Sequence, residues 1–573
     1  MIIGQSHQLS AEGVFADGHQ ADLTSSVTWS SSNPQVAAVS TSGLLTAMTT
    51  GSVAITAQAG SVVSSTPTIA AAYAGVMTYH NDLARTGQNL SETALTPANV
   101  NLKQFGKLLS YPVDGAIYAQ PLIAMSVPIP NQGVHNVVYV ATEHDSVYAF
   151  DADGGSSMPL WHDSFVDPAS GMLSVYAPAV SNQAFHQSEI GITGTPVIDP
   201  DNGTLYVVTY TSEGGGFVYR LHALDITTGA ERSGGPVSIE AQVQGAGAGG
   251  DGEGHIAFNP QMHLQRMGLA LAGGSVYVGF ASQADTAPWH GWLLAFDSST
   301  LAQVASYNAT PDGYGGGIWQ AGGAPAIDAD GSVYLASGNG TFDAPSSGAD
   351  FGDSVLKLQA RSLQLLDWFT PFNQSLMGDQ DLDLGSGGIM LLPDQTGAHP
   401  QMLVLAGKFS SIYLLDRTNL GHFNAGSDNV VQRLDSQTGQ MFSTPAYWQG
   451  HVYFAGWNDN LKMFSILGGV LSDEPSSSSS NTFGFAGATP SISAQGAANG
   501  IVWTVDYSQS GVEGAAVLYA FDATDVSKLL YASNELPRDQ LGPAAKFSVP
   551  TVYNGKVYVG TATELDILGL IAN

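Results

Sequence analysis

Two cations stand out in a chain that has few of them. Arg266 and Lys546 occupy equivalent positions in two copies of a repeated sequence pattern, in a protein with 16 Lys and Arg against 48 Asp and Glu. Two cations at a common cavity could hold a carboxylate or a sugar acid, and the planar guanidinium suits a bidentate contact. The alternative interpretation is that each cation pairs with a neighbouring acid inside the fold.

Glu189 and His290 are the candidates for proton transfer. Glu189 precedes the sequence Ile190-Gly191 and could act as a general acid or base if it is desolvated. His290 lies between Trp289 and Trp292, which suits sugar stacking or a proton relay. A structural hydrogen bond for Glu189 and a packed histidine in a turn are the alternatives. The candidate catalytic set is therefore Glu189, His290, Arg266 and Lys546.

Three carboxylates at alternate positions suggest a metal site. Asp379, Asp381 and Asp383 have the spacing with which a loop can supply several oxygen ligands to calcium. The EF-hand pattern is not met, because Leu384 stands at its sixth position and no glutamate at its twelfth. The sequence leaves open a calcium site or a solvated acidic turn.

The elements that must position these residues are copies of one unit. Residues 138–142 (VYVAT) and 147–151 (VYAFD) read as two strands joined by a turn, and eight such pairs recur down to residues 565–568. Many copies follow a proline, which fits the first residue of a strand. A small sheet of this kind cannot bury both of its faces by itself, so each copy must stack on its neighbours. Arranging the copies in a closed ring leaves only short, protected strand edges. We predict an all-β chain with a β-propeller, eight-bladed rather than seven-bladed.

Ring closure and the lining of a central funnel follow from this fold. Residues 105–111 read as a strand ahead of the first full repeat, and pairing with residues 565–570 would complete one blade from both ends of the ring. Side chains near the strand starts are expected to face the funnel. The predicted ligand-binding residues are Tyr118, Gln120, Gln265, Trp319, Gln320 and Phe442.

Composition restricts the partners and the compartment. The net charge of −32 argues against nucleic acid and anionic membranes as partners. The absence of cysteine excludes thiolate metal sites and disulfides. No apolar run is long enough to span a bilayer. We expect an extracellular or periplasmic protein whose export signal has been removed, although no signal peptide is visible. The serine tract at residues 476–480 is predicted to be a flexible surface loop.

Residues 1–70 differ from the rest of the chain. Short alternating segments, such as residues 27–34 (VTWSSSNP) and 51–57 (GSVAITA), predict a small antiparallel sandwich. These phrases resemble the bacterial Ig-like group 2 domains. The resemblance implies a spacer or an adhesive module, with possible attachment to a cell surface. Residues 71–76 are the predicted linker, and residues 77–573 the predicted propeller.

The start of the propeller carries a second resemblance. Residues 79–89 (YHNDLARTGQN), followed by residues 95–100 (LTPANV), resemble the lead-in of quinoprotein alcohol dehydrogenase-like propellers, whose repeats the strand pairs also resemble. That family implies pyrroloquinoline quinone, stacked between a tryptophan and commonly a ring of cysteines, with calcium and an aspartate base. This chain has no cysteine, and the family's Ala-x-Asp-x-x-Thr-Gly signature survives only in fragments. The Cys-x-x-Cys-His motif is missing, so we expect no haem.

Two functions from different classes remain open at this point. The first is an exported or surface protein whose funnel binds a small polar ligand or a glycan. The second is an enzyme, either a divergent quinone-dependent alcohol or sugar dehydrogenase or a glycan-cleaving propeller. The fold and the function have to be argued separately.

Overall fold

The computed structural model describes residues 1–180, 188–511 and 514–571. Strands dominate these residues, and their one α-helix, α1 (Gln374–Asp379), is short. Single 3₁₀ turns lie at Ala177–Ala179, Gln320–Gly322, Ala344–Ser346, Leu384–Ser386 and Pro537–Asp539. The prediction of an all-β chain is confirmed. In the described part of the chain, no helix has the length and apolar character needed to cross a membrane.

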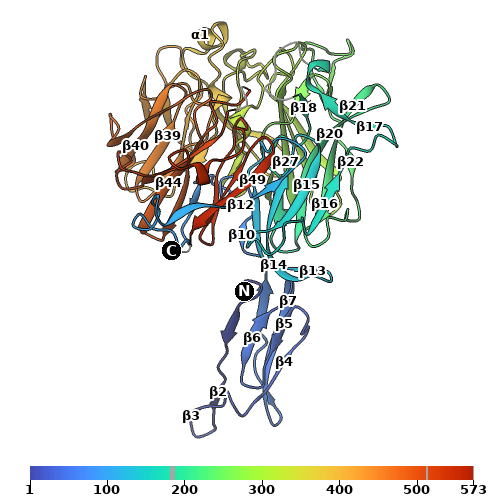
Figure 1. The fold of residues 1–573 in the computed structure, drawn as a ribbon. Coiled ribbons are helices and arrows are strands. Elements are labelled where there is room, and N and C mark those ends of the chain that lie inside the picture. The colour runs from blue at the N-terminus through green and yellow to red at the C-terminus, as the bar shows by residue number, and fades with distance from the viewer. Residues whose placement is uncertain (181–187, 512–513, 572–573) are drawn as a thin grey trace.

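A ring of sheets makes up the body of the molecule, and a small domain projects from it (Figure 1). The first sheet has β10 (Gly75–Val76), β13 (Leu122–Ile129), β14 (Gly133–Ala141), β15 (Ser146–Asp151) and β16 (Trp161–Ser164). The second has β17 (Met172–Tyr176), β18 (Glu189–Ile190), β19 (Val197–Asp199), β20 (Thr204–Glu213), β21 (Gly216–Asp225) and β22 (Val237–Ser238). The third has β25 (His263–Leu264), β26 (Ala270–Ala272), β27 (Ser275–Ser282), β28 (Trp292–Asp297) and β29 (Gln303–Asn308). A separate hairpin joins β23 (Gln242–Gln244) to β24 (His255–Ala257).

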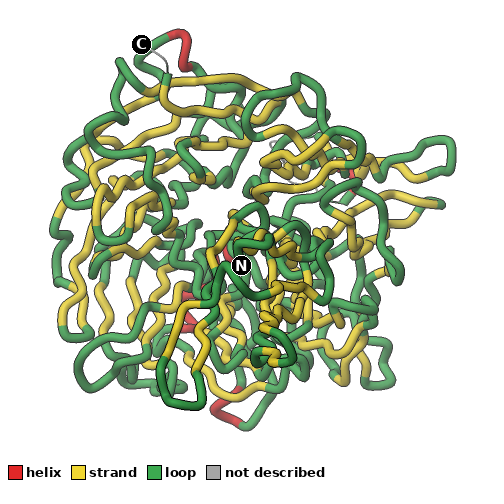
Figure 2. Tube along the Cα trace, turned by 90° about the horizontal axis from the view of Figure 1, so that it is seen from below, coloured by secondary structure: helices red, strands yellow, loops and turns green. Residues whose placement is uncertain are grey.

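The remaining sheets continue around the ring (Figure 2). The fourth has β30 (Ala326–Ile327), β31 (Val333–Ala336), β32 (Val355–Leu358) and β33 (Leu365–Phe369), and the fifth has β34 (Met390–Leu391), β35 (Met402–Ala406), β36 (Ile412–Asp416) and β37 (Gln432–Leu434). The sixth has β38 (Ala446–Trp448), β39 (His451–Ala455), β40 (Asp459–Leu467), β41 (Val470–Leu471) and β42 (Ser477–Phe483). The next has β11 (Gln88–Asn89), β43 (Ser491–Gln495), β44 (Ala498–Asp506), β45 (Val517–Asp522) and β46 (Leu529–Ala532).

The last sheet draws on both ends of the ring. It contains β47 (Thr551–Tyr553), β48 (Lys556–Gly560) and β49 (Glu564–Leu570), together with β12 (Phe105–Pro112) from early in the chain. β12 lies antiparallel to β49, with Phe105 opposite Leu570. β12 therefore covers the outer edge of β49, and one sheet links the beginning of the ring to its end.

Burial explains the sequence pattern of the central strands. Every residue of β15 and of β27 is buried, because each sheet packs between two neighbouring sheets and both of its faces are covered. The serine tract was predicted wrongly as a loop. All of its residues except Ser476 belong to β42, which pairs with β40, and the hydroxyl of Ser479 accepts a hydrogen bond from the backbone N–H of Leu461. Serine suits this strand because the strand is on the outer, half-exposed side of the sheet.

The segment that leads into the ring fills its centre. The side chain of Arg85 is buried and donates five hydrogen bonds, two of them to the carbonyl of Pro325 just ahead of β30. The ring of His80 lies 2.8 Å from the carbonyl of Pro490, ahead of β43, and the hydroxyl of Tyr79 donates to Thr444. Residues 79–89 are thus a central plug that ties several inner strands together.

The small domain is built from short strands. They are β1 (Ser6–Gln8), β2 (Glu12–Val14), β3 (Gln20–Asp22), β4 (Thr28–Ser31), β5 (Ala37–Val39), β6 (Leu44–Ala47), β7 (Gly51–Ala59), β8 (Val62–Val63) and β9 (Thr68–Ala71). Its first residues run beside its last ones, since Ile3 donates to the carbonyl of Ala72 and Ala72 donates to that of Met1. Tyr73, which follows, is buried and bonds to Pro200 of the ring.

Candidate functional site

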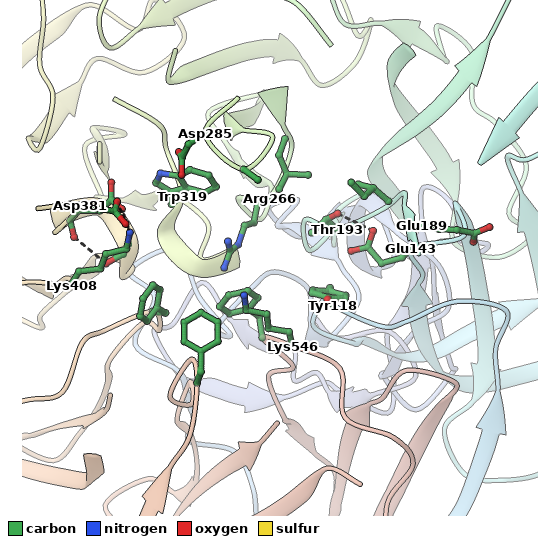
Figure 3. Close-up of a pocket in the computed structure, with 18 residues that line it drawn as sticks. Tyr118, Glu143, Glu189, Thr193, Arg266, Asp285, Trp319, Asp381, Lys408 and Lys546 are labelled. Atoms are coloured by element: carbon green, nitrogen blue, oxygen red, sulfur yellow. Dashed lines mark hydrogen bonds and ion pairs between the residues drawn. The ribbon is translucent and has the colours of Figure 1, made fainter. Parts of the chain in front are cut away.

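A cavity of about 370 Å³ opens among the inner ends of the blades. A pocket of this size suits a small organic ligand. Figure 3 shows Arg266 and Lys546 in its middle, with Glu143, Thr193 and Glu189 on one side and Lys408 with Asp381 on the other. The further lining residues are Tyr118, Ile190, Leu264, Ala284, Asp285, Trp319, Asp383, Ser386, Phe442, Phe485 and Phe547.

The two cations share one aromatic ring. The guanidinium carbon of Arg266 lies 3.8 Å, and Nζ of Lys546 4.8 Å, from the centre of the Phe547 ring. Phe485 contacts Lys546 from another side, at 4.4 Å. Phe547 itself has a φ of 65°, a left-handed conformation that bulky residues rarely adopt and that is often found at functional sites.

Neither cation has an acidic partner among the residues that the structure describes. Nε of Arg266 is buried without a hydrogen bond, and Lys546 forms no ion pair within the described ranges. Burial lowers the pKa of Arg266 to about 10. Burial and the neighbouring Arg266 together lower the pKa of Lys546 to about 7. The cation–π contacts offset part of this desolvation. The pair therefore forms a positive site with no carboxylate of the described fold at ion-pair distance, and Glu143 acts on Arg266 only across the cavity.

Glu143 lies on the opposite wall, on the turn between β14 and β15. Its carboxylate accepts hydrogen bonds from the backbone N–H of Gly191 and from the hydroxyl of Thr193, at 2.8 and 3.1 Å. Burial nevertheless raises the pKa of Glu143 to about 7. Glu189 is half-exposed and is held by His144, whose Nδ1 lies 2.7 Å from its carboxylate. Of the two glutamates, Glu143 is therefore the one whose environment suits proton transfer.

The acidic segment predicted to bind calcium is paired with a lysine from another part of the chain. Nζ of Lys408 forms ion pairs with both Asp381 and Asp383, whereas Asp379 ends α1 and is exposed. No group of three or more metal-ligating acids or histidines forms within residues 1–180, 188–511 and 514–571. The three aspartates thus do not converge on a calcium site in the described structure, because the ammonium group of Lys408 stands where a cation would bind. Burial lowers the pKa of Lys408, but its pairs with Asp383 and Asp381 outweigh burial and raise it.

Removal of this lysine is expected to create a dependence on calcium. In Lys408→Met, Asp381 and Asp383 lose their counter-ion, so the melting temperature should fall and then recover by about 3 °C or more in millimolar calcium. Differential scanning fluorimetry with and without EDTA measures this. Lys462→Met is the control, since Lys462 pairs with a single acid, Asp459, and should not respond to calcium. Equal melting curves for Lys408→Met in calcium and in EDTA would contradict the expectation.

The structure brings some predicted site residues to the cavity and leaves others out. Tyr118, Glu189, Arg266, Trp319, Phe442 and Lys546 line it, as do Asp381 and Asp383. Gln120, Gln265 and Gln320 do not. Gln120 accepts from the backbone N–H of His80, and Gln320 from that of Ala336, so both side chains tie the inner strands together. Gln265 donates to the carbonyl of Met267.

His290 lies outside the cavity lining. It is buried, with Nε2 at 2.8 Å from the carbonyl of Ala248 and Nδ1 at 3.0 Å from that of Thr310. These contacts fit a packed histidine in a turn, which was the alternative to sugar stacking or a proton relay. Five further residues line the cavity that were not predicted from the sequence, namely Glu143, Asp285, Lys408, Phe485 and Phe547. The scarcity of basic residues was the signal that could have singled out Lys408.

The ring has a β-propeller fold similar to that of solved quinoprotein dehydrogenases, and it follows a domain of bacterial Ig-like type. Residues 1–70 match the family of bacterial Ig-like domains (group 2), which confirms that resemblance. Three solved structures share the fold of the ring over 87% of this chain. The similar enzyme from Comamonas testosteroni, a quinohemoprotein alcohol dehydrogenase, is 15% identical with a TM-score of 0.54 over 81% of its length.

The other two similar structures agree. A quinohemoprotein alcohol dehydrogenase from Pseudomonas putida HK5 is 14% identical, with a TM-score of 0.55 over 81% of its length. A europium-containing methanol dehydrogenase is 14% identical, with a TM-score of 0.54 over 98% of its length. At such identities the likeness establishes the fold alone. Ice-binding protein 1 of Shewanella frigidimarina (strain NCIMB 400) is 34% identical over 122 residues, which are 20% of this chain and 12% of that protein.

Proposed function

We propose that the propeller binds a small polar ligand that carries a carboxylate, a sugar acid or short organic acid, at Arg266 and Lys546. The observation that carries this proposal is a pair of half-buried, desolvated cations that form no ion pair in the described structure. The chain has 48 acidic residues against 16 basic ones, so an internal partner would have been easy to provide. Burying a charge is costly unless it is paired, and a ligand carboxylate would supply the missing charge.

Comparison with Arg85 supports this interpretation of Arg266. Arg85 is buried and has all of its guanidinium nitrogens hydrogen-bonded within the fold, whereas Arg266 is half-buried and its buried Nε has no hydrogen bond. Arg266 instead faces a cavity whose other walls include the rings of Trp319, Phe485 and Phe547. Aromatic faces suit the C–H surface of a sugar or of a short acid.

Two ligands that differ by one carboxylate test the proposal. Isothermal titration calorimetry with glucuronate and with glucose should show saturable binding of glucuronate and much weaker binding of glucose. Lactate, gluconate and galacturonate extend the series to short and open-chain acids. Equal affinity for glucose and glucuronate would overturn the role of the cations, and no binding of any acid would overturn the proposed function.

The affinity for a carboxylate is expected to depend on pH. Lys546 has a pKa of about 7, so its ammonium form is present below that pH and is lost above it. Glu143 ionises over the same range and adds repulsion. Affinity should therefore fall by up to about tenfold as the pH rises from about 6 to about 8. Titrations at several pH values measure it. In the double variant Lys546→Arg, Glu143→Gln the profile should be flat, because arginine stays protonated.

A quinone-dependent oxidoreductase is the second candidate, favoured by the fold of the similar structures and by three cations around one cavity. Pyrroloquinoline quinone carries three carboxylates, and Arg266 and Lys546 fit that anionic part. The residues do not fit the calcium that accompanies the quinone, because Lys408 already bridges Asp381 and Asp383. Absorbance and thermal-shift titrations with the quinone test this candidate. Saturable stabilisation that needs no calcium would favour it over a sugar acid.

The remaining parts of the proposal concern architecture and location. We infer eight blades, because eight sheets follow one another between β10 and β49 and the last includes β12. Residues 1–70 are proposed as the Ig-like domain, 71–76 as its connection and 77–573 as the propeller. An exported protein, periplasmic or extracellular and associated with a cell surface through its Ig-like domain, fits the bacterial Ig-like domain and the acidic composition. Cell fractionation followed by immunoblotting tests the location.

A further inference from the structure

Lys546 differs from the other lysine of the cavity in its surroundings. Lys408 is held by two aspartates. Lys546 has no described ion-pair or hydrogen-bond partner and lies between the rings of Phe485 and Phe547, beside a second cation. Desolvation by apolar groups and a neighbouring positive charge are the two conditions that turn a lysine amine into a nucleophile near neutral pH.

Arg266 adds a means of orienting a substrate. Because Arg266 and Lys546 contact the same Phe547 ring, one short molecule can reach both groups. Arg266 can bind a carboxylate in a bidentate manner, which would place an adjoining carbonyl carbon toward the amine. Glu143, Glu189, Asp285, Asp381 and Asp383 also line the cavity, but burial and Arg266 are what act on the pKa of Lys546.

We propose that Lys546 is a nucleophilic lysine that captures short oxo acids as imines, with Arg266 holding the carboxylate of the same molecule. This inference rests on the proposed function, since it uses the same carboxylate site. The unprotonated amine attacks the carbonyl carbon and forms a carbinolamine. The C–O bond then breaks, the oxygen leaves as water, and a carbon–nitrogen double bond remains. No oxidant or reductant is consumed, and the reaction is reversible.

Imine formation would make the site chemically active toward the bound oxo acid, in addition to binding it. A protonated imine withdraws electrons from the neighbouring carbon, so the C–H bonds beside the former carbonyl become more acidic. A bound oxo acid should therefore exchange these hydrogens with solvent. Glu143, with its pKa of about 7, is a group on the cavity wall that could relay such protons.

Reductive trapping tests the proposal in the full-length protein. The protein is incubated with pyruvate and cyanoborohydride near neutral pH, and the adduct is located by intact mass and peptide mapping. Lys546 should be labelled at least about tenfold faster than Lys408, whose aspartate partners hold its pKa above the usual range, and than the exposed Lys528, which does not line the cavity. Acetone, which has the carbonyl without the carboxylate, should label Lys546 at least about tenfold more slowly than pyruvate.

Variants and pH distinguish this mechanism from general lysine reactivity. Lys546→Arg keeps the positive charge and should abolish the adduct while the melting temperature is retained. Arg266→Met should remove the preference for pyruvate over acetone. At low pyruvate concentration the rate constant reports the free protein, and it should rise with pH through about 7. Labelling spread over the lysines in proportion to their exposure, or no adduct at Lys546, would overturn the proposal.

Lactate separates this proposal from the one on which it rests. Lactate carries the carboxylate of pyruvate but no carbonyl. Binding of lactate in calorimetry without a pyruvate adduct would refute imine formation and leave the carboxylate site intact. Binding of glucuronate with no binding of pyruvate would refute the imine proposal alone, and failure of glucuronate, lactate and pyruvate alike to bind would refute both proposals.

Discussion

Arg266→Met is expected to weaken carboxylate binding by about 100-fold, because it removes the donor that pairs with a desolvated ligand charge. The same change should leave the melting temperature equal or higher. Arg266 has no described side-chain hydrogen bond or ion pair that its loss would break, and removal of an unpaired, desolvated charge relieves its desolvation cost. Calorimetry with glucuronate and differential scanning fluorimetry measure the two effects.

The combination of the two effects is what makes this variant informative. Removal of a structural arginine would lower the stability of the fold, whereas removal of a ligand-binding arginine would lower only the affinity for the ligand. Arg361→Met is the matched control, because Arg361 lies on the surface and pairs with Asp297. It should change neither quantity appreciably. A marked loss of stability in Arg266→Met with unchanged affinity would assign Arg266 to the fold and refute the proposed site.

Arg85→Met is expected to have the opposite pattern, with the free energy of unfolding lowered by about 3 kcal/mol or more. The variant loses five hydrogen bonds and leaves the carbonyl of Pro325 buried without its donor. The denaturant midpoint, followed by tryptophan fluorescence, measures the loss. Because Arg85 lies in the central plug and not in the cavity lining, folded Arg85→Met should still bind glucuronate. An unchanged midpoint would mean that the plug does not hold the inner strands together.

The strands were predictable because their pattern is imposed by burial. Each pair of apolar runs must lie between two neighbouring sheets, so the repeats read clearly in the sequence, and the prolines stand directly ahead of strands such as β13, β30 and β43. β42 was missed because an outer strand needs no apolar residues. Its serines face solvent or bond to the neighbouring strand.

The site was predictable only in part, because side-chain direction changes from one residue to the next. Arg266 lines the cavity while Gln265 bonds within the wall, and Trp319 lines it while Gln320 does not. Closeness to the start of a strand could not show which of two adjacent residues faces the cavity. The two cations were recognisable because basic residues are rare in this chain. Glu143 was not, since it stands in an ordinary turn and only burial distinguishes it.

The way in which the Ig-like domain joins the ring limits what it can do mechanically. Met1 and Ile3 bond to Ala72, so the first and last residues of the domain lie together at the end next to the propeller (Figure 1). A tether attached to residue 1 would pull at this junction, and its load would bypass the far tip with β2 and β3. The domain therefore adds no length between an anchor and the ring. The domain projects from the ring, and its far end with β2 and β3 points away from it (Figure 1).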